Sequence, residues 1–232
     1  MSARLHEFKD GATLAESLAD RVAGVLADAV AARGKATLAV SGGSTPKAFF
    51  KALSGRDLDW SKVTITLVDE RFVPADNARS NHLLVADNLL QGKAKEAGFL
   101  PLYRAAGSAE EAARIVSADA ESLGHPFDVA ILGMGTDGHT ASFFPGGNRL
   151  AEAISDETPR GVITMEAEGA GEPRLTFTFA SLQDARLLVL HIEGQGKKDV
   201  LAAAEGDGPE TDMPVRAILR RAATPVDIYW AP

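Results

Sequence analysis

The sequence predicts an α/β fold in which an open, mostly parallel sheet is flanked by helices, with a smaller antiparallel segment. Short apolar runs, typical of buried parallel strands, alternate along the chain with stretches whose apolar residues recur at helical spacing. Three of these strands end in glycine-rich or charged loops. One later segment, Leu175–Phe179, alternates strictly and indicates a strand with one wetter face. Such alternation of strands and helices is typical of a Rossmann-like domain.

The first half of the chain alternates helix and strand patterns. Leu14, Leu18 and Val22 belong to the first helical repeat, and Gly34 follows it as a stop. We expect, in order, a helix over 10–33, a strand over 36–40, a helix over 47–53, a strand over 63–68 and a helix over 80–90.

The second half continues the alternation. We expect a helix over 108–123, a strand over 127–132, the alternating strand, a strand over 186–192, helices over 197–204 and 215–222, and a closing strand over 226–230. Ser108 and Glu111 have the spacing of a capping box. Residues 145–173 and 205–214 are rich in glycine, proline and acids and are predicted to be loops. Because there is no internal repeat and no clear linker, we expect residues 1–232 to form a single domain.

Composition excludes several classes of protein. The chain has 232 residues, of which 45% are hydrophobic and 24% charged, as in an ordinary globular protein. No apolar run is long enough to span a membrane, and the N-terminus lacks the apolar core of a secretory signal. The absence of cysteine excludes disulfides and zinc–sulfur sites and fits a cytoplasmic location. A net charge of −8 disfavours nucleic acid and anionic membranes as partners.

The loop Ser41–Pro46 follows a predicted strand and precedes a predicted helix. Its glycines let backbone N–H groups approach an anion, the helix N-terminus adds partial positive charge, and Ser41, Ser44 and Thr45 add hydroxyl groups. These features predict a phosphate site, although no Walker A motif is present. The alternative is an ordinary strand-to-helix turn with a serine or threonine cap.

Two further loops carry candidate chemistry. Asp69, Glu70 and Arg71 follow a strand, where they offer a base and an anion donor or, alternatively, form a surface cluster of ion pairs. The loop Gly133–His139 contains G-x-G-x-x-G, but Pro145 interrupts the helix that a dinucleotide site requires, and the expected acidic residue falls in a loop. We therefore reject a dinucleotide cofactor.

His139 is the best candidate for a general base. Neutral imidazole accepts a proton near pH 7, and Asp137, two residues earlier, offers a carboxylate to orient the ring. The alternative is an isolated loop histidine without a role. The remaining histidines suggest no chemistry, there is no clustered set of metal ligands, and the G-x-S-x-G elbow of serine hydrolases is absent.

Five strings occur in an order that resembles the glucosamine-6-phosphate isomerase/6-phosphogluconolactonase family, and within it the lactonases. They are LAVSGGSTPKAFF, ITLVDERFVPADNARSNH, FDVAILGMGTDGHTASFFPG, RLTFTFASL and GQGKKDVL. The resemblance covers nearly the whole chain, and its most specific part is D-G-H-T-A-S-F-F-P. It implies a Rossmann-like fold and hydrolysis of 6-phospho-D-glucono-1,5-lactone to 6-phospho-D-gluconate in the oxidative pentose phosphate pathway, with no cofactor and no metal.

The resemblance also implies roles for individual residues. His139 activates water, and Arg71 contacts substrate and stabilises the developing oxyanion. Asp69 and Asp137 position their neighbours. The phosphate is held by the loop and by two cations, which are Ser41, Gly42, Gly43, Ser44, Thr45, Arg174 and Lys197. The expected partner is a small sugar-phosphate lactone, and the expected assembly is a monomer or a small homo-oligomer.

Two alternatives remain open at this stage. An aminosugar-6-phosphate deaminase shares these loops but carries a glutamate before the proline of the histidine block, where this chain has Phe144. A noncatalytic sugar-phosphate-binding module retains the phosphate loop and loses the base, whereas Asp137 and His139 are both present here.

Overall fold

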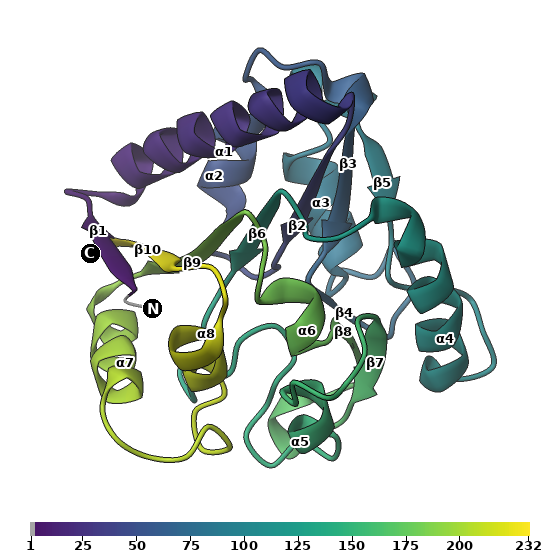
Figure 1. Ribbon diagram of the computed structural model, residues 1–232, viewed down its shortest axis with the longest axis vertical. Helices are drawn as coiled ribbons and strands as arrows, with labels where there is room; N and C mark the ends of the chain where they lie inside the picture. The colour runs from purple at the N-terminus through teal and green to yellow at the C-terminus, as the bar shows by residue number, and fades with distance from the viewer. Residues whose placement is uncertain (1–2) are drawn as a thin grey trace.

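The computed structural model describes residues 3–232 and contains two β-sheets with helices packed around them (Figure 1). The larger sheet has seven strands, all parallel to their neighbours. In sheet order they are β1 (Arg4–Glu7), β10 (Val226–Ala231), β9 (Leu187–Glu193), β6 (Val129–Leu132), β2 (Ala36–Val40), β3 (Val63–Leu67) and β5 (Gly98–Leu100).

The smaller sheet is antiparallel and has the order β4 (Asp69–Arg71), β8 (Arg174–Phe177) and β7 (Val162–Met165). Val68 joins the two sheets. Its N–H donates to Val40 O in the large sheet, and its carbonyl accepts from Phe177 N in the small one. These two sheets confirm the predicted fold class, including its antiparallel segment.

Helices cover both faces of the large sheet. Figure 1 shows α1 and α2 on one side of the sheet and α6, α7 and α8 on the other. The helices are α1 (Gly11–Arg33), α2 (Lys47–Ser54), α3 (Asn81–Asn88), α4 (Ala109–Ala120), α5 (Leu150–Ala153), α6 (Phe179–Leu182), α7 (Gln195–Glu205) and α8 (Val215–Arg221). Short 3₁₀ turns occur at η1 (Trp60–Lys62), η2 (Gly92–Glu96), η3 (Glu121–Leu123) and η4 (Glu168–Ala170). None of the helices in residues 3–232 is long and apolar enough to cross a membrane.

The strand order reverses between β2 and β6. From β2 the chain builds outward through β3 to β5, and from β6 it builds the opposite way through β9 to β10. In open α/β sheets, ligands bind beyond the carboxyl ends of the strands at such a reversal. The loops Ser41–Pro46 and Gly133–His139 leave the carboxyl ends of these two neighbouring strands.

Most predicted elements are confirmed, with boundary shifts of a few residues at most. Asp10 caps α1 by accepting from Thr13 N at 2.7 Å. The predicted capping box of α4 is half formed. Ser108 Oγ accepts from Glu111 N, but the Glu111 carboxylate accepts from Gly107 N instead of closing back on Ser108.

Three expectations about the sheets are wrong. Asp69, Glu70 and Arg71 form strand β4, because they pair with β8, which lies far away in the sequence. The predicted loop 145–173 contains α5 and β7. The strand predicted over 175–179 ends at Phe177, and all four residues of β8 are buried, because it lies between β4 and β7 and is also contacted by α4. The short edge strands β1 and β5 were not predicted.

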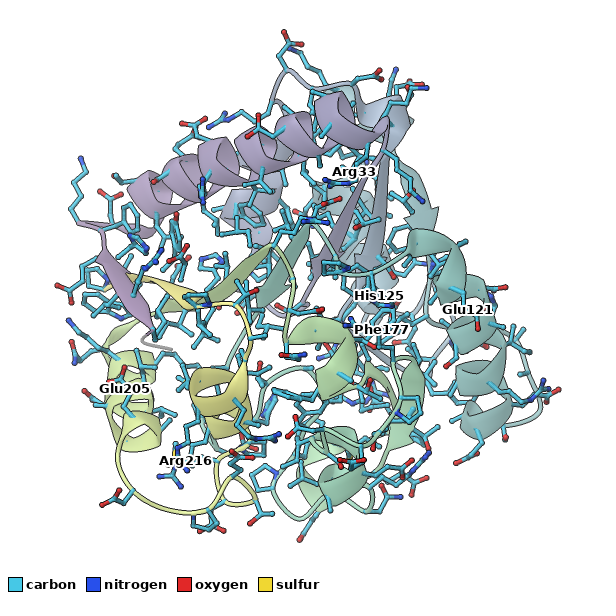
Figure 2. All side chains as sticks on the ribbon, viewed as in Figure 1. Arg33, Glu121, His125, Phe177, Glu205 and Arg216 are labelled. Carbon is cyan, nitrogen blue, oxygen red and sulfur yellow. The ribbon has the colours of Figure 1, made fainter. Side chains whose placement is uncertain are left out.

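The aromatic side chain of Phe177, at the end of β8, packs against Phe127, which lies just before β6. It is fully buried, and its ring meets the ring of Phe127 edge-on, with 5.3 Å between centroids (Figure 2). A buried phenylalanine is stabilised both by removal from water and by close packing.

We expect Phe177→Ala to lower the free energy of unfolding by about 3–5 kcal/mol, because it leaves a cavity beside Phe127 in the core. Leu5, which is 47% exposed on β1, provides the control, and Leu5→Ala should change stability by less than about 0.5 kcal/mol. Urea unfolding followed by circular dichroism measures both, and equal effects would contradict this packing.

Candidate functional site

A cavity of about 310 Å³ lies at the strand reversal. It is lined by the loops that follow β2 and β6, by strand β4, by the start of β8, by the end of β9 and by the first turns of α3 and α7. Ten of the predicted site residues line it, namely Ser41, Gly42, Gly43, Ser44, Thr45, Asp69, Arg71, His139, Arg174 and Lys197. Asp137 lies behind His139 and is absent from the lining. The parallel strands thus bring together groups that are widely separated in the sequence.

The loop Ser41–Pro46 forms one wall of the cavity. Ser41 N donates to Ile131 O at 3.0 Å, which extends the pairing of β2 with β6 into the loop. α2 starts at Lys47, directly after Pro46. Gly42 is required by close packing, because a Cβ there would lie 1.8 Å from Asn81 Oδ1. The loop therefore combines backbone, hydroxyl groups and a helix N-terminus, as a phosphate site does.

Arg71 and Arg174 form a second wall. They are direct cross-strand partners in the pairing of β4 with β8. Like charges placed opposite each other in a sheet are destabilising. Within residues 3–232, the Nε atom of each is buried without a hydrogen-bond partner. Two adjacent guanidinium groups with unused donors make this wall a strong attractor for an anion.

Burial lowers the pKa of Arg174, nearby Asp69 raises it, and the neighbouring charge of Arg71 lowers it further. Its Nη2 donates to Ala170 O at 2.7 Å, and its guanidinium lies 5.3 Å from the centre of the Phe144 ring. These contacts fix the direction of the side chain in the cavity wall. An anion beside Arg174 would offset the cost of burying its charge.

Lys197 adds a third cation from the first turn of α7. Its Nζ donates to Met134 O at 2.7 Å. Burial lowers the pKa of this ammonium, while the charge of Asp137 works in the opposite direction. The hydrogen bond to Met134 holds the lysine against the loop that carries His139.

His139 and Asp137 form a close pair. The Nδ1 atom of His139 lies 2.6 Å from Asp137 Oδ1, which also accepts from His139 N at 3.1 Å. Because an ionised carboxylate only accepts hydrogen bonds, this contact favours, in the neutral imidazole, the tautomer with the proton on Nδ1 and the lone pair on Nε2. Only glycine fits at position 135, since a Cβ there would lie 2.1 Å from the same Nδ1. The arrangement is that of an oriented base.

Asp69 and Glu70 have different surroundings. Asp69 is buried, and its Oδ2 accepts from Ser142 Oγ at 2.6 Å. Glu70 is fully buried and accepts from Ser80 Oγ and from the N–H groups of Arg71, Asn81 and His82. Burial raises the pKa of Glu70, and these four donors act against that increase. Glu70 therefore fastens the start of α3 to β4 and does not line the cavity.

Three of the other lining residues have side chains whose contacts were not predicted from the sequence. Asn81 donates from Nδ2 to Asp69 O at 2.9 Å, and its Oδ1 is buried against Gly42. The Phe144 ring lies 4.4 Å from the His139 ring. His191 is buried in β9, with Nε2 3.1 Å from Glu193 Oε1. The contact of Asn81 with Gly42 joins distant parts of the sequence. The contacts of Phe144 and His191 are local, but no pattern in the sequence indicated them.

The acidity of Asp137 reports the contact with His139. Burial alone would raise the pKa of this carboxyl, but the hydrogen bond and the charge of His139 outweigh it and lower the pKa from 3.8 to about 2. The pair therefore stabilises the folded state above pH 3.8, and this contribution is lost as the pH falls through about 2.

We expect the Asp137 carboxyl to titrate near pH 2 and to move up toward 3.8 in His139→Ala. Carbon-13 NMR of the side-chain carboxyl measures this directly. His6→Ala, which alters a histidine on β1 outside the cavity lining, is the control and should leave the titration unchanged. A normal Asp137 titration in the unmodified protein would refute the contact.

Comparison with known proteins identifies the family. Residues 9–230 match the family described as glucosamine-6-phosphate isomerases/6-phosphogluconolactonase. A Rhizobium meliloti protein named 6-phosphogluconolactonase is 71% identical over 232 residues, covering 100% of both chains. The crystal structure of a 6-phosphogluconolactonase from Shewanella baltica superimposes with a TM-score of 0.96 at 38% identity, covering 100% of this chain and 98% of that one. This chain therefore belongs to the glucosamine-6-phosphate isomerase/6-phosphogluconolactonase family.

Proposed function

We propose that the protein hydrolyses 6-phospho-D-glucono-1,5-lactone to 6-phospho-D-gluconate, with His139 as the general base. The observation that carries this proposal is that one cavity joins a phosphate-type loop and three cations to an oriented His139. The names of the relatives give the substrate class. Hydrolysis of a phosphorylated lactone requires groups that bind the phosphate and a base that removes a proton from the attacking water.

The charges of the cavity match such a substrate. Arg71, Arg174 and Lys197 line it, whereas the whole chain has a net charge of −8. A phosphate dianion is therefore drawn to this cavity and repelled by most of the remaining surface. Arg174, Lys197 and the Ser41–Thr45 loop are proposed to hold the phosphate, with Asp69 keeping Arg174 in place.

The proposed reaction uses His139 twice. Nε2 accepts a proton from water as the water oxygen attacks C1 of the lactone, and Arg71 stabilises the oxyanion that forms on the carbonyl oxygen. The bond between C1 and the ring oxygen then breaks, and the ring oxygen takes the proton from His139 to become a hydroxyl group. The new carboxylic acid ionises in water. Asp137 keeps the imidazole in the correct tautomer throughout.

This chemistry requires no cofactor or metal, because a lactone is already an activated ester. The cytoplasmic location and the monomeric or small homo-oligomeric assembly stay predictions, as does the single domain over 1–232. One hydrophobic cluster that extends from Leu14 of α1 to Phe177 of β8 supports that domain assignment.

The deaminase alternative is disfavoured at Phe144. Deaminases of this family carry a glutamate at this place, whereas here an aromatic ring packs 4.4 Å from His139. A phenyl group neither accepts nor donates a proton, so it cannot assist the ring opening that an aminosugar requires. The lactone needs no such second acid.

We expect the wild-type protein to accelerate hydrolysis of freshly generated lactone, measured with 6-phosphogluconate dehydrogenase as reporter and corrected for the spontaneous rate. His139→Ala should lower kcat by about 10²–10⁴-fold, because it removes the base. His6→Ala, a substitution outside the cavity, should have no effect. No acceleration by the wild type would overturn the proposal, and ammonia release from glucosamine-6-phosphate would favour the deaminase.

Arg174→Ala should raise KM by roughly 10–100-fold and weaken inhibition by inorganic phosphate similarly, because a charge-assisted hydrogen bond to phosphate is lost. Arg79→Ala is the control, since Arg79 forms an ion pair with Glu172 and does not line the cavity. Steady-state kinetics with phosphate as competitor gives both values. An unchanged KM in Arg174→Ala would place the phosphate elsewhere.

A further inference from the structure

The loop that carries His139 is held from outside the cavity by the segment that follows β9. Val215 N, at the start of α8, donates to Gly138 O at 2.9 Å. Met213 packs against the same glycine so closely that a Cβ at Gly138 would lie 2.9 Å from Met213 Cβ. Both contacts reach the residue directly before the proposed base.

Arg216 fixes this segment in place. Its side chain is 5% exposed and, among residues 3–232, forms no ion pair. Its guanidinium instead donates to four backbone carbonyls at 2.8 to 3.2 Å, which are Ala203, Ala204, Asp207 and Pro209. Two of these carbonyls belong to the last turn of α7, where no helical N–H is available to them. Figure 2 shows Arg216 on α8 beside the loop that joins it to α7.

Together these contacts, which we call the clamp, hold the loop that carries His139. Lys197, at the other end of α7, donates to Met134 O, so α7 and α8 hold the glycine-rich loop near both of its ends. Between these points the loop is short, and its turn is closed by Gly138 N donating to Gly135 O at 3.2 Å. Because Gly138 lies between Asp137 and His139 in the chain, the position of Gly138 bears directly on the placement of both residues.

We propose that Met213 and Arg216 are positioning residues for His139. They touch neither the cavity nor the His139 ring, and they act by fixing Gly138 against the start of α8. Arg216 holds the loop between α7 and α8, which carries Met213. The side chain of Met213 and the N–H of Val215 then fix the position of Gly138, and with it the position of His139. The kinetic part of this inference rests on the proposed lactonase activity, whereas the structural part does not.

The test compares Met213→Ala, Met213→Leu and Thr211→Ala. Thr211 is an exposed residue of the same loop. Long-range ¹H–¹⁵N correlation of the His139 ring reports which nitrogen carries the proton, with His139→Ala to assign the signal. We expect the Nδ1–H tautomer in the wild type, Met213→Leu and Thr211→Ala, and a mixture of tautomers in Met213→Ala. A folded Met213→Ala with an unchanged tautomer would overturn the proposal.

Steady-state kinetics show whether each substitution changes kcat, KM or both. Misplacement of a catalytic group by about 1 Å costs up to about 10²-fold in rate. We expect Met213→Ala to lower kcat by roughly 10–100-fold with KM within about twofold of wild type, because the phosphate loop is untouched. Loss of kcat with an intact His139 tautomer, or a rise in KM alone, would contradict a positioning role.

Arg216→Lys provides the second variant. Lysine keeps the charge but cannot reach four carbonyls from one planar group, so we expect the same tautomer mixture as in Met213→Ala. If Arg216→Lys does not fold, Met213→Ala still decides the question. If the wild type does not hydrolyse the lactone, the proposed function fails while the tautomer measurement still tests the clamp.

Discussion

Strands β2 and β6 are hydrogen-bonded neighbours, although β3, α3, β5 and α4 separate them in the chain. This pairing is the constraint on which the rest of the site depends. It pairs Val40, the last residue of β2, with Ile131 near the end of β6, so that the loops starting at Ser41 and Gly133 lie side by side. Parallel neighbours force the loops at their carboxyl ends to converge, whereas an antiparallel pair would send them to opposite edges.

The second constraint on the site is that the fold must accommodate two arginines whose positive charges repel each other. Arg71 opposes Arg174 across β4 and β8, and burial already works against the charge of Arg174. Asp69, held by Ser142, compensates only in part. A fold that maintains such a pair retains an unmet attraction for an anion, and a bound phosphate would stabilise the native state through that attraction. In the proposed function, the same unmet attraction would both bind the phosphate and stabilise this part of the fold once the phosphate is bound.

Local patterns revealed most of the elements and loops. The helical repeat of α1 and the apolar runs of β2 and β6 are local, so the sequence displays them directly. Strand β4 was missed because its three residues carry charges and acquire a strand conformation only by pairing with β8. Glu70 was grouped with Asp69 and Arg71 as candidate chemistry for the same reason, because its four donors come from β4 and the start of α3 and meet it only in the folded chain.

The candidate site shows the same division. The spacing of Asp137 and His139 suggested a pair, and their contact confirms that geometry. The proximity of Asn81 to Gly42 left no local signal, because α3 and the β2–α2 loop meet only in the folded chain. The contact of Met213 with Gly138 was equally hidden, since residues 205–214 show only the composition of a loop. The chemical role open to a single residue can therefore be predicted from the sequence, whereas the contacts that hold such residues in place appear only in the folded structure.

In the proposed function, a single cavity holds the phosphate at one wall and presents the lactone carbon to His139 at another. A crystal structure with 6-phospho-D-gluconate bound tests this arrangement most directly. We expect the phosphate against the Ser41–Thr45 loop and Arg174, with the C1 carboxylate within hydrogen-bond reach of Arg71 and of His139 Nε2, directly or through one water. A phosphate bound beside His139, with the carboxylate at the Ser41–Thr45 loop, would contradict it.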